Sequence, residues 1–442
     1  MASSRLVLTA RGAGGLLGAL IVLVLAFYTI NILLFAVAVF LLAFMLAALF
    51  AFVRATRGFG PDAFEAQRVE SSSFVSVGGH AFVSVRVSSQ LEGAFYTEIF
   101  DSHPERLAVL DGDTRLVTWW DRGEPLTLAY VVSPKMRGQF EIGPTVVVAH
   151  DSFGFAFKLA TLRTSWKIEA LPNPVSVALG HPTRLSNLVV GQTSLFMRGA
   201  GSDFHALREY QPEDEPRNIA WSRSGKGTLY VREYDRESQQ DLIVILDVGR
   251  PMAMGVAYED ALEKATEAAS VLVRNSFDED VRTGLLLYSD RVVRYLPPRR
   301  GSDHEFLVFR TLGAAQVEPP YSSFDVALSY LLPRLGRATS LIAFSSMGGK
   351  PDVIASAYGT LRRAGHRLYV LAPDVRGMYP DPTDPSHLAA LRLVMGPEVL
   401  RAQGAAGSLR HLGIPVGFFG RTGALEAVNV LFSRVRAPQG AP

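Results

Sequence analysis

The stretch that most constrains this chain is the run from Gly12 to Val53, which contains no charged residue and is bounded on both sides by arginine. One membrane-spanning helix needs about 20 apolar residues, so the run is long enough for two. Its least apolar point is Tyr28–Asn31, near the middle. A cleaved signal peptide is the alternative, but its apolar region is only about 7–15 residues long. The sequence therefore predicts a hairpin of two membrane-spanning helices within residues 1–57, with a tight turn at Asn31.

Basic residues flank both ends of the predicted hairpin. Arg5 and Arg11 precede it, and Arg54 and Arg57 follow it. Because lysine and arginine near membrane spans favour the cytoplasmic side, both ends are expected there. We expect an integral membrane protein with two N-terminal spans, in contact with the lipid bilayer, and with the bulk of the chain in the cytoplasm.

Residues 58–190 read as a β-rich domain. The segment Phe74–Ser89 alternates apolar and polar residues around a Gly-Gly turn signal, and Leu126–Ser133 and Thr145–His150 are rich in β-branched residues. Short strands at regular spacing are typical of a β-sandwich or a barrel. We predict a β-sandwich-like domain, which carries no catalytic constellation.

The pattern changes at Asp241, where strands begin to alternate with helices. DLIVILD (241–247) is a continuous apolar strand that ends in a carboxylate, as expected for a strand buried on both faces of a parallel sheet. Alternating strands and amphipathic helices continue through residues 241–442. This order predicts an open α/β sheet with helices on both faces, compatible with a von Willebrand A-like, Rossmann-like domain.

The segment between these domains, residues 191–240, contains the most unusual stretch of the chain, Gly201–Arg236. It reads as short turns rich in paired charges, followed by a strand over Thr228–Glu233. Such clusters form either a fixed network of ion pairs and hydrogen bonds or a partner-binding surface, and the sequence leaves both open. The residues concerned are Arg208, Glu209, Tyr210, Asp214, Arg217, Trp221, Arg232 and Glu233.

The run LREYQPEDEPRNIAW (207–221), followed by LYVREYD and LIVILDVGRPM, resembles the signature of the family known as domain of unknown function 58. A second match is MRGQFEIGP (136–144) with HDSFGFA (150–156). The resemblance implies a membrane hairpin, a β-rich domain and a von Willebrand factor A-like domain. It also implies a protein partner, a MoxR-type AAA+ ATPase.

A-like domains hold a divalent cation through an Asp-x-Ser-x-Ser loop, a later Thr and a later Asp, and such a hard cation prefers oxygen ligands. Here Asp247 is present, but Gly249 and Pro251 replace the two serines. Ser322 or Ser323 stands near the threonine position, and the later strand carries Ser346 in place of Asp. We therefore expect a degenerate remnant of the metal site at Asp247, Ser323 and Ser346. No metal or other cofactor is expected, although magnesium stays possible. Asp247 would instead cap the following turn or pair with an arginine of the charged cluster.

Composition excludes several other classes. The chain has no cysteine, which rules out thiol catalysis and cysteine-ligated metals, and its formal net charge of +2 gives no reason to expect nucleic acid. Nucleophile-elbow, phosphate-loop and zinc-protease motifs are missing from the sequence. Ser202, Asp203 and His205 are neighbours in sequence, which rarely yields the geometry of a hydrolase triad.

We thus expect a non-enzymatic, membrane-anchored adaptor that presents its A-like domain to a protein partner. The family resemblance implies that this partner is a MoxR-type ATPase and that the two act together in the assembly or maturation of a complex. Two alternatives stay open: a structural cell-envelope protein that binds through its β-rich domain, and metal-dependent adhesion. The sequence leaves the oligomeric state undecided.

Overall fold

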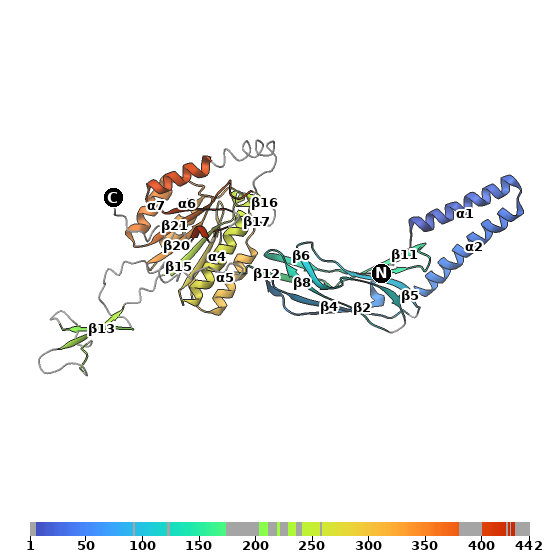
Figure 1. Cartoon of the computed structure of the whole chain (residues 1–442), viewed down its shortest axis with the longest axis horizontal. Helices are drawn as coiled ribbons and strands as arrows, with labels where there is room; N and C mark the ends of the chain where they lie inside the picture. The colour runs from blue at the N-terminus through green and yellow to red at the C-terminus, as the bar shows by residue number, and fades with distance from the viewer. Residues whose placement is uncertain are drawn as a thin grey trace. The chain divides into compact units, whose positions relative to one another are not determined.

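The chain forms two compact units, Met1–Leu171 and Pro172–Pro442 (Figure 1). The computed structural model describes residues 6–91, 93–121, 124–173, 203–210, 219–221, 229–235, 241–256, 259–379, 400–420, 423–424 and 426–428, with the side chains of 203–208 and 232–235 outside that description. The predicted domain boundaries after residues 57, 190 and 240 stay predictions.

The first unit begins with the predicted pair of apolar helices, α1 (Ala10–Thr29) and α2 (Ile32–Ala55). Asn31 ends the turn between them, because its side-chain oxygen accepts hydrogen bonds from the backbone N–H groups of Leu33 and Leu34 at 3.0 and 3.3 Å. Both helices are long and apolar enough to cross a membrane. Only 17% of the most apolar segment of α1 and 11% of that of α2 are buried within the chain. The prediction of two N-terminal apolar helices is confirmed.

Three sheets make up the rest of the first unit. A five-stranded antiparallel sheet has the order β1-β11-β10-β5-β7, a four-stranded antiparallel sheet has the order β2-β4-β8-β6, and a three-stranded sheet has the order β3-β12-β9. Their strands are β1 (Val7–Leu8), β2 (Phe64–Glu70), β3 (Phe74–Ser76), β4 (Ala81–Ser89), β5 (Phe95–Asp101), β6 (Leu107–Gly112), β7 (Arg115–Trp120), β8 (Leu126–Pro134), β9 (Gly138–Ile142), β10 (Thr145–His150), β11 (Ala156–Leu162) and β12 (Trp166–Leu171).

One apolar core serves all three of these sheets. It contains Val85 of β4, Ile99 of β5 and Ile168 of β12, and the α2 residue Phe52 joins it. The alternation seen in the sequence explains this core, because the buried positions of β4 are every second residue.

The second unit is built on a six-stranded sheet of order β19-β18-β15-β20-β21-β22, in which β19 is antiparallel and the other strands are parallel. Its strands are β15 (Asp241–Asp247), β18 (Thr283–Tyr288), β19 (Val292–Arg299), β20 (Thr339–Phe344), β21 (Arg367–Pro373) and β22 (Val416–Phe419). The helices are α4 (Ala261–Asp278), α5 (Ser302–Ala314), α6 (Phe324–Leu331) and α7 (Pro351–Arg363), and residues 400–411 are also helical.

Helices cover both faces of this sheet, as the sequence predicts (Figure 1). Alternate residues of β15 enter opposite cores: Val244 packs with α4 and α5, and Ile245 packs with α6 and α7. Every residue of β15 is buried, which accounts for its continuous apolar sequence.

The charged stretch contains a strand that the sequence analysis did not predict. β13 (Asp203–Glu209) pairs antiparallel with β14 (Tyr230–Asp235), so the stretch expected to form turns up to Thr228 begins with a strand of a hairpin. Its alternation is hidden because charged residues fall at both odd and even positions of the sequence Asp203–Glu209, which removes the period-two signal.

His366, which precedes β21, gives the second unit a dependence on pH. Its Nδ1 accepts a hydrogen bond from the backbone N–H of Thr339 at 3.1 Å, and burial lowers its pKa below 6.5. As pH falls, the unfolded chain takes up a proton at His366 before the folded chain does. The contribution of neutral His366 to stability is therefore complete above about pH 6.5 and is lost as pH falls through the lowered pKa of the folded chain. We expect the unfolding free energy to fall by up to about 1.4 kcal/mol per pH unit in that window.

The measurement is the thermal unfolding of the full chain between pH 7.5 and 5. His366→Gln keeps an acceptor but does not titrate, so it should show a shallower loss of stability. His411→Gln, at an exposed position, serves as the control and should follow the wild type. A His366→Gln profile parallel to the wild type would exclude His366 as the source.

Candidate functional site

The candidate site lies at the carboxyl ends of the parallel strands and centres on Asp247. Asp247 is the last residue of β15, in the middle of the six-stranded sheet, and its side chain is 0% exposed. The chain then turns through Gly249 into a short 3-10 segment, Arg250–Ala253. Ligands of open α/β sheets bind at this edge of the sheet.

Both oxygens of the Asp247 carboxylate accept hydrogen bonds from the protein. Oδ1 accepts from the backbone N–H of Gly249 at 2.9 Å and from the Ser322 hydroxyl. Oδ2 accepts from the backbone N–H and the hydroxyl of Ser346, at 2.9 and 2.6 Å. Burial raises the pKa of the Asp247 carboxyl, and these hydrogen bonds oppose that rise. Asp247 thus caps the following turn and also ties together three loops.

Ser322, rather than the Ser323 named from the sequence, reaches Asp247. The Ser323 hydroxyl donates instead to Asp325 Oδ1 at 2.6 Å. Ser323 has an extended backbone, and successive side chains of an extended chain point to opposite sides. The sequence left the choice between these serines open, and only the path of the loop decides it.

Gly249 is required by the close approach of Ser322 to Asp247. A Cβ atom at position 249 would overlap the Ser322 hydroxyl oxygen and would lie 2.9 Å from the carbonyl oxygen of Pro320. A serine at this position would therefore displace Ser322 from the carboxylate. Pro251, at the second serine position, offers no oxygen from its side chain.

A second buried layer, which the sequence analysis missed, lies behind Asp247. The Tyr288 hydroxyl and the Ser345 hydroxyl are 2.7 Å apart, and both side chains are buried. Ser345 also accepts the backbone N–H of Met347 at 2.9 Å, which shapes the loop after β20. Burial raises the pKa of Tyr288 well above 10. The only sequence signal was a polar residue at the end of each apolar strand.

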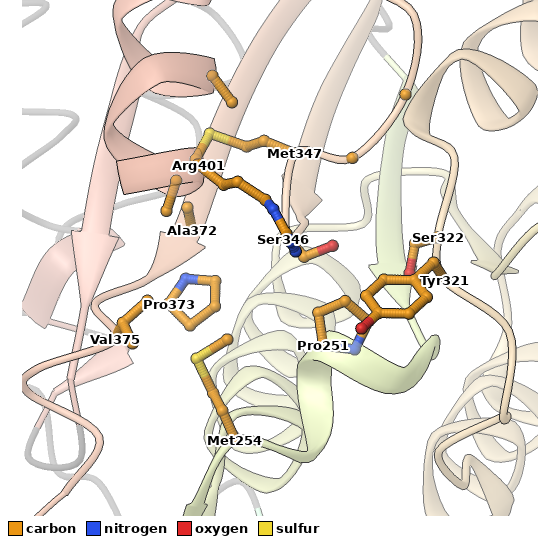
Figure 2. Close-up of a pocket in the computed structure, with 14 residues that line it drawn as sticks. Pro251, Met254, Tyr321, Ser322, Ser346, Met347, Ala372, Pro373, Val375 and Arg401 are labelled. Carbon is orange, nitrogen blue, oxygen red and sulfur yellow. The ribbon is translucent and has the colours of Figure 1, made fainter. Parts of the chain in front are cut away.

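A cavity of about 280 Å³ opens beside this network (Figure 2). Its lining is mostly apolar and includes Pro251, Met254, Met347, Pro373 and Val375, with Ser322 and Ser346 on the side of Asp247. Figure 2 shows the Arg401 side chain directed toward Ser346. At the edge, the Arg250 guanidinium lies 5.9 Å from the ring centroid of Tyr321, which is itself 57% exposed.

The cavity can therefore receive an apolar side chain together with a polar or anionic group. In the described part of the chain, no three His, Asp or Glu side chains come close enough together to hold a metal ion.

The charged cluster of the signature is only partly described. Arg208, Arg232 and Glu233 are placed by their backbone in the β13–β14 hairpin, where Leu207 pairs with Arg232 and Ala206 with Glu233. Asp214 and Arg217 lie outside the described residues.

Three residues of the cluster can be assessed by their side chains. Glu209 is exposed, Tyr210 is partly exposed, and Trp221 is 68% exposed. The neighbouring Ile219, Ala220 and Val231 are buried. Trp221 therefore presents a large aromatic side chain to the solvent beside a small packed cluster.

Comparison with known proteins gives relatives of unassigned function. The uncharacterized proteins Rv1480 of Mycobacterium tuberculosis and Mb1516 of Mycobacterium bovis are each 22% identical over 147 residues. Each alignment covers 33% of this chain and 46% of the relative, so the match spans less than half the length of these proteins.

Two solved structures are also similar in part. The conserved hypothetical protein BatB from Bacteroides thetaiotaomicron has 16% identity over 44% of this chain and 98% of its own, with a TM-score of 0.29. An aerotolerance-related membrane protein from Bacteroides fragilis has 14% identity over 44% of this chain and 99% of its own, with the same TM-score.

The family match is the more specific finding. Residues 206–379, which run from the signature through β21, match the family described as "Protein of unknown function DUF58". This confirms the resemblance carried by the run LREYQPEDEPRNIAW. Through residues 206–379 the chain is therefore similar to the DUF58 family.

Proposed function

We propose that this protein is a non-enzymatic adaptor, anchored to the membrane by α1 and α2, that presents the strand ends of its second unit to a protein partner. One observation carries the proposal: the buried Asp247 carboxylate is satisfied by four donors of its own chain and stands beside a largely apolar cavity. A carboxylate held in this way stiffens three loops, and a rigid apolar pocket with a few polar groups suits the binding of a side chain.

We also propose the type of domain that each unit forms. The first unit would be a β-sandwich-like domain, because its sheets share one core. The second would be a von Willebrand A-like domain, because a parallel sheet covered by helices carries an Asp at the end of its central strand. In such domains this Asp belongs to a cation site.

A cation does not fit the residues of this chain. Gly249 and Pro251 supply no side-chain oxygen, and the Ser322 hydroxyl is already bonded to Asp247. Oδ2 of Asp247 is taken by both donors of Ser346. A divalent ion prefers six or more oxygen ligands with at least some carboxylates free to bind it. We therefore propose that Asp247 works without a metal, which argues against metal-dependent adhesion.

The arginines that flank the two helices suggest how the chain is oriented in the membrane. Arg11 near the start of α1, Arg54 near the end of α2 and the following Arg57 are exposed. By the preference of such residues for the cytoplasmic side, both folded units would lie in the cytoplasm. Protease treatment of sealed inside-out and right-side-out vesicles tests this, since digestion only in right-side-out vesicles would place the units outside.

The proposed partner is a MoxR-type AAA+ ATPase, as the family resemblance suggests. We expect the partner to contact the exposed Trp221 and the cavity residue Arg401. Tryptophan and arginine dominate the energetics of protein interfaces. The test is co-purification of the tagged full chain with a co-expressed MoxR-type ATPase from the same organism.

We expect Trp221→Ala or Arg401→Ala to reduce the bound ATPase by about thirtyfold, the effect of losing one hot-spot residue. Leu110→Ala, at a position 52% exposed in the first unit, is the control and should bind as the wild type does. If the wild-type chain itself retains no ATPase, the adaptor proposal fails and a structural role in the cell envelope becomes the better explanation.

A further inference from the structure

The membrane hairpin is fastened directly to the β-sheets of the first unit. Thr9, at the start of α1, donates its hydroxyl to the carbonyl oxygen of Gly154 at 2.6 Å, and its backbone N–H to that of Phe155 at 2.9 Å. At the end of α2, the buried Lys158 ammonium donates to the carbonyl oxygen of Thr56 at 2.9 Å. The folded sheets therefore cannot move freely away from the bases of the helices.

The loop Asp151–Phe155 between β10 and β11 is part of this junction and has a fixed shape. Asp151 is buried, and its Oδ2 accepts the backbone N–H groups of Phe153 and Phe155 at 3.2 and 3.0 Å. Gly154 adopts a positive φ of 72° that completes the turn. This arrangement holds the Phe153 ring outward, and its side chain is 52% exposed.

Phe153 lies against the membrane hairpin well inside its apolar length. Its ring centroid is 4.9 Å from that of Phe44, on α2. At 1.5 Å per residue, Phe44 lies about 20 Å along α2 from the turn at Asn31 and about 17 Å before the helix ends. When the turn at Asn31 is placed at the edge of the hydrocarbon core that is distant from the folded units, Phe44 lies about 10 Å inside the opposite edge of a core about 30 Å thick.

We propose that the loop Asp151–Phe155 is a membrane-inserting foot that buries Phe153 in the hydrocarbon of the leaflet next to the folded units. This inference rests on the proposed anchoring by α1 and α2 and adds a third contact with lipid. An exposed phenylalanine at this depth has acyl chains as its surroundings, and its burial there is favoured by the hydrophobic effect.

An aromatic row beside the loop extends the same surface. Cross-strand pairing places Trp119, Tyr96, His150 and Phe157 next to one another on one face of the five-stranded sheet, across β7, β5, β10 and β11. His150 is the residue before the loop, so this row lies at the strand ends closest to Phe153. Trp119 is 53% exposed and Tyr96 is 41% exposed. Tryptophan and tyrosine favour the membrane–water interface, which is where this row would lie.

The test uses the absence of cysteine from the chain, because single cysteines can then be labelled without background. Full-length Phe153→Cys, labelled with a nitroxide, is reconstituted into phosphatidylcholine–phosphatidylglycerol vesicles. The ratio of its collision rates with oxygen and with a water-soluble nickel chelate reports the depth of the label. Ser152→Cys, which keeps Phe153 in place, is measured in parallel.

Two further labels calibrate the result. Leu110→Cys replaces a side chain that is exposed to the same degree as Phe153, and Phe40→Cys lies on α2 at a position 69% exposed. We expect the nitroxide at position 153 (label 153) to resemble that at position 40 (label 40), with collisions with oxygen strongly favoured over collisions with the nickel chelate. Label 152 should be shifted in the same direction, and label 110 should collide more with the nickel chelate.

If labels 153 and 152 resemble label 110 while label 40 favours oxygen, the foot is disproved and the anchoring stands. If label 40 also favours nickel, the anchoring itself is wrong and the foot falls with it.

Discussion

Asp247→Ala is expected to destabilise the six-stranded sheet by about 3–5 kcal/mol, the cost typical of breaking a buried charged network. The substitution removes the acceptor for the Gly249 N–H, the Ser322 hydroxyl and both donors of Ser346, all at the buried end of the central strand. A buried donor without a partner costs about 1–3 kcal/mol, and relaxation of the loops would recover part of the sum.

The measurement is hydrogen exchange of β15 and β20 peptides in the detergent-solubilised full chain. A loss of about 3 kcal/mol corresponds to exchange more than about a hundredfold faster. Asp374→Ala is the matched control, because Asp374 also follows a parallel strand but is exposed, and it accepts a hydrogen bond from the Arg376 N–H at 3.2 Å. It should cost about 1 kcal/mol or less. Equal effects of the two substitutions would show that Asp247 is not a structural centre.

Asp101→Ala is expected to destabilise the first unit by a similar amount, about 3–5 kcal/mol. Asp101 pairs with Arg68 at 2.8 Å, and the two side chains are 0% and 6% exposed. Asp101 also accepts hydrogen bonds from Tyr130 at 2.5 Å and Thr145 at 2.9 Å. Truncating the carboxylate leaves the Arg68 charge buried without its counter-ion, which is the source of the cost.

Hydrogen exchange in β4, β5 and β8 measures this effect in the same preparation. Arg115→Ala removes an ion pair of the same sheet, Arg115–Glu98, in which Arg115 is 65% exposed, so it should cost about 1 kcal/mol or less. The double variant Arg68→Met, Asp101→Leu leaves no unpaired charge and should recover part of the loss. A double variant no more stable than Asp101→Ala would contradict this explanation.

The parts of the fold that the sequence predicted are those set by local pattern. The uncharged run and Asn31 specify the apolar hairpin because length and hydropathy alone decide such helices. The buried strand of residues 241–247 and the helices after it follow from their periodicity. The strand β13 escaped prediction because its charged residues hide the alternation.

The site was harder to predict because its contacts join distant loops. Asp247 was identifiable as a carboxylate ending an apolar strand, but its partners Ser322 and Ser346 come from other parts of the chain. The pairing of Tyr288 with Ser345, and that of Lys158 with Thr56, likewise depend on tertiary packing. Sequence pattern carries no information about which of two adjacent serines faces inward.

We propose that the strand ends form a closed, metal-free network around Asp247, and titration of the full chain with Mg²⁺ or Mn²⁺ tests this proposal most directly. At about 10 mM ion, a site with a Kd of about 1 mM would raise the stability by about 1.4 kcal/mol. We predict no saturable heat in calorimetry and no shift of the melting temperature, for the wild type and for Asp247→Ala alike. Saturable binding by the wild type that Asp247→Ala abolishes would contradict the claim and make a metal-dependent function the better explanation.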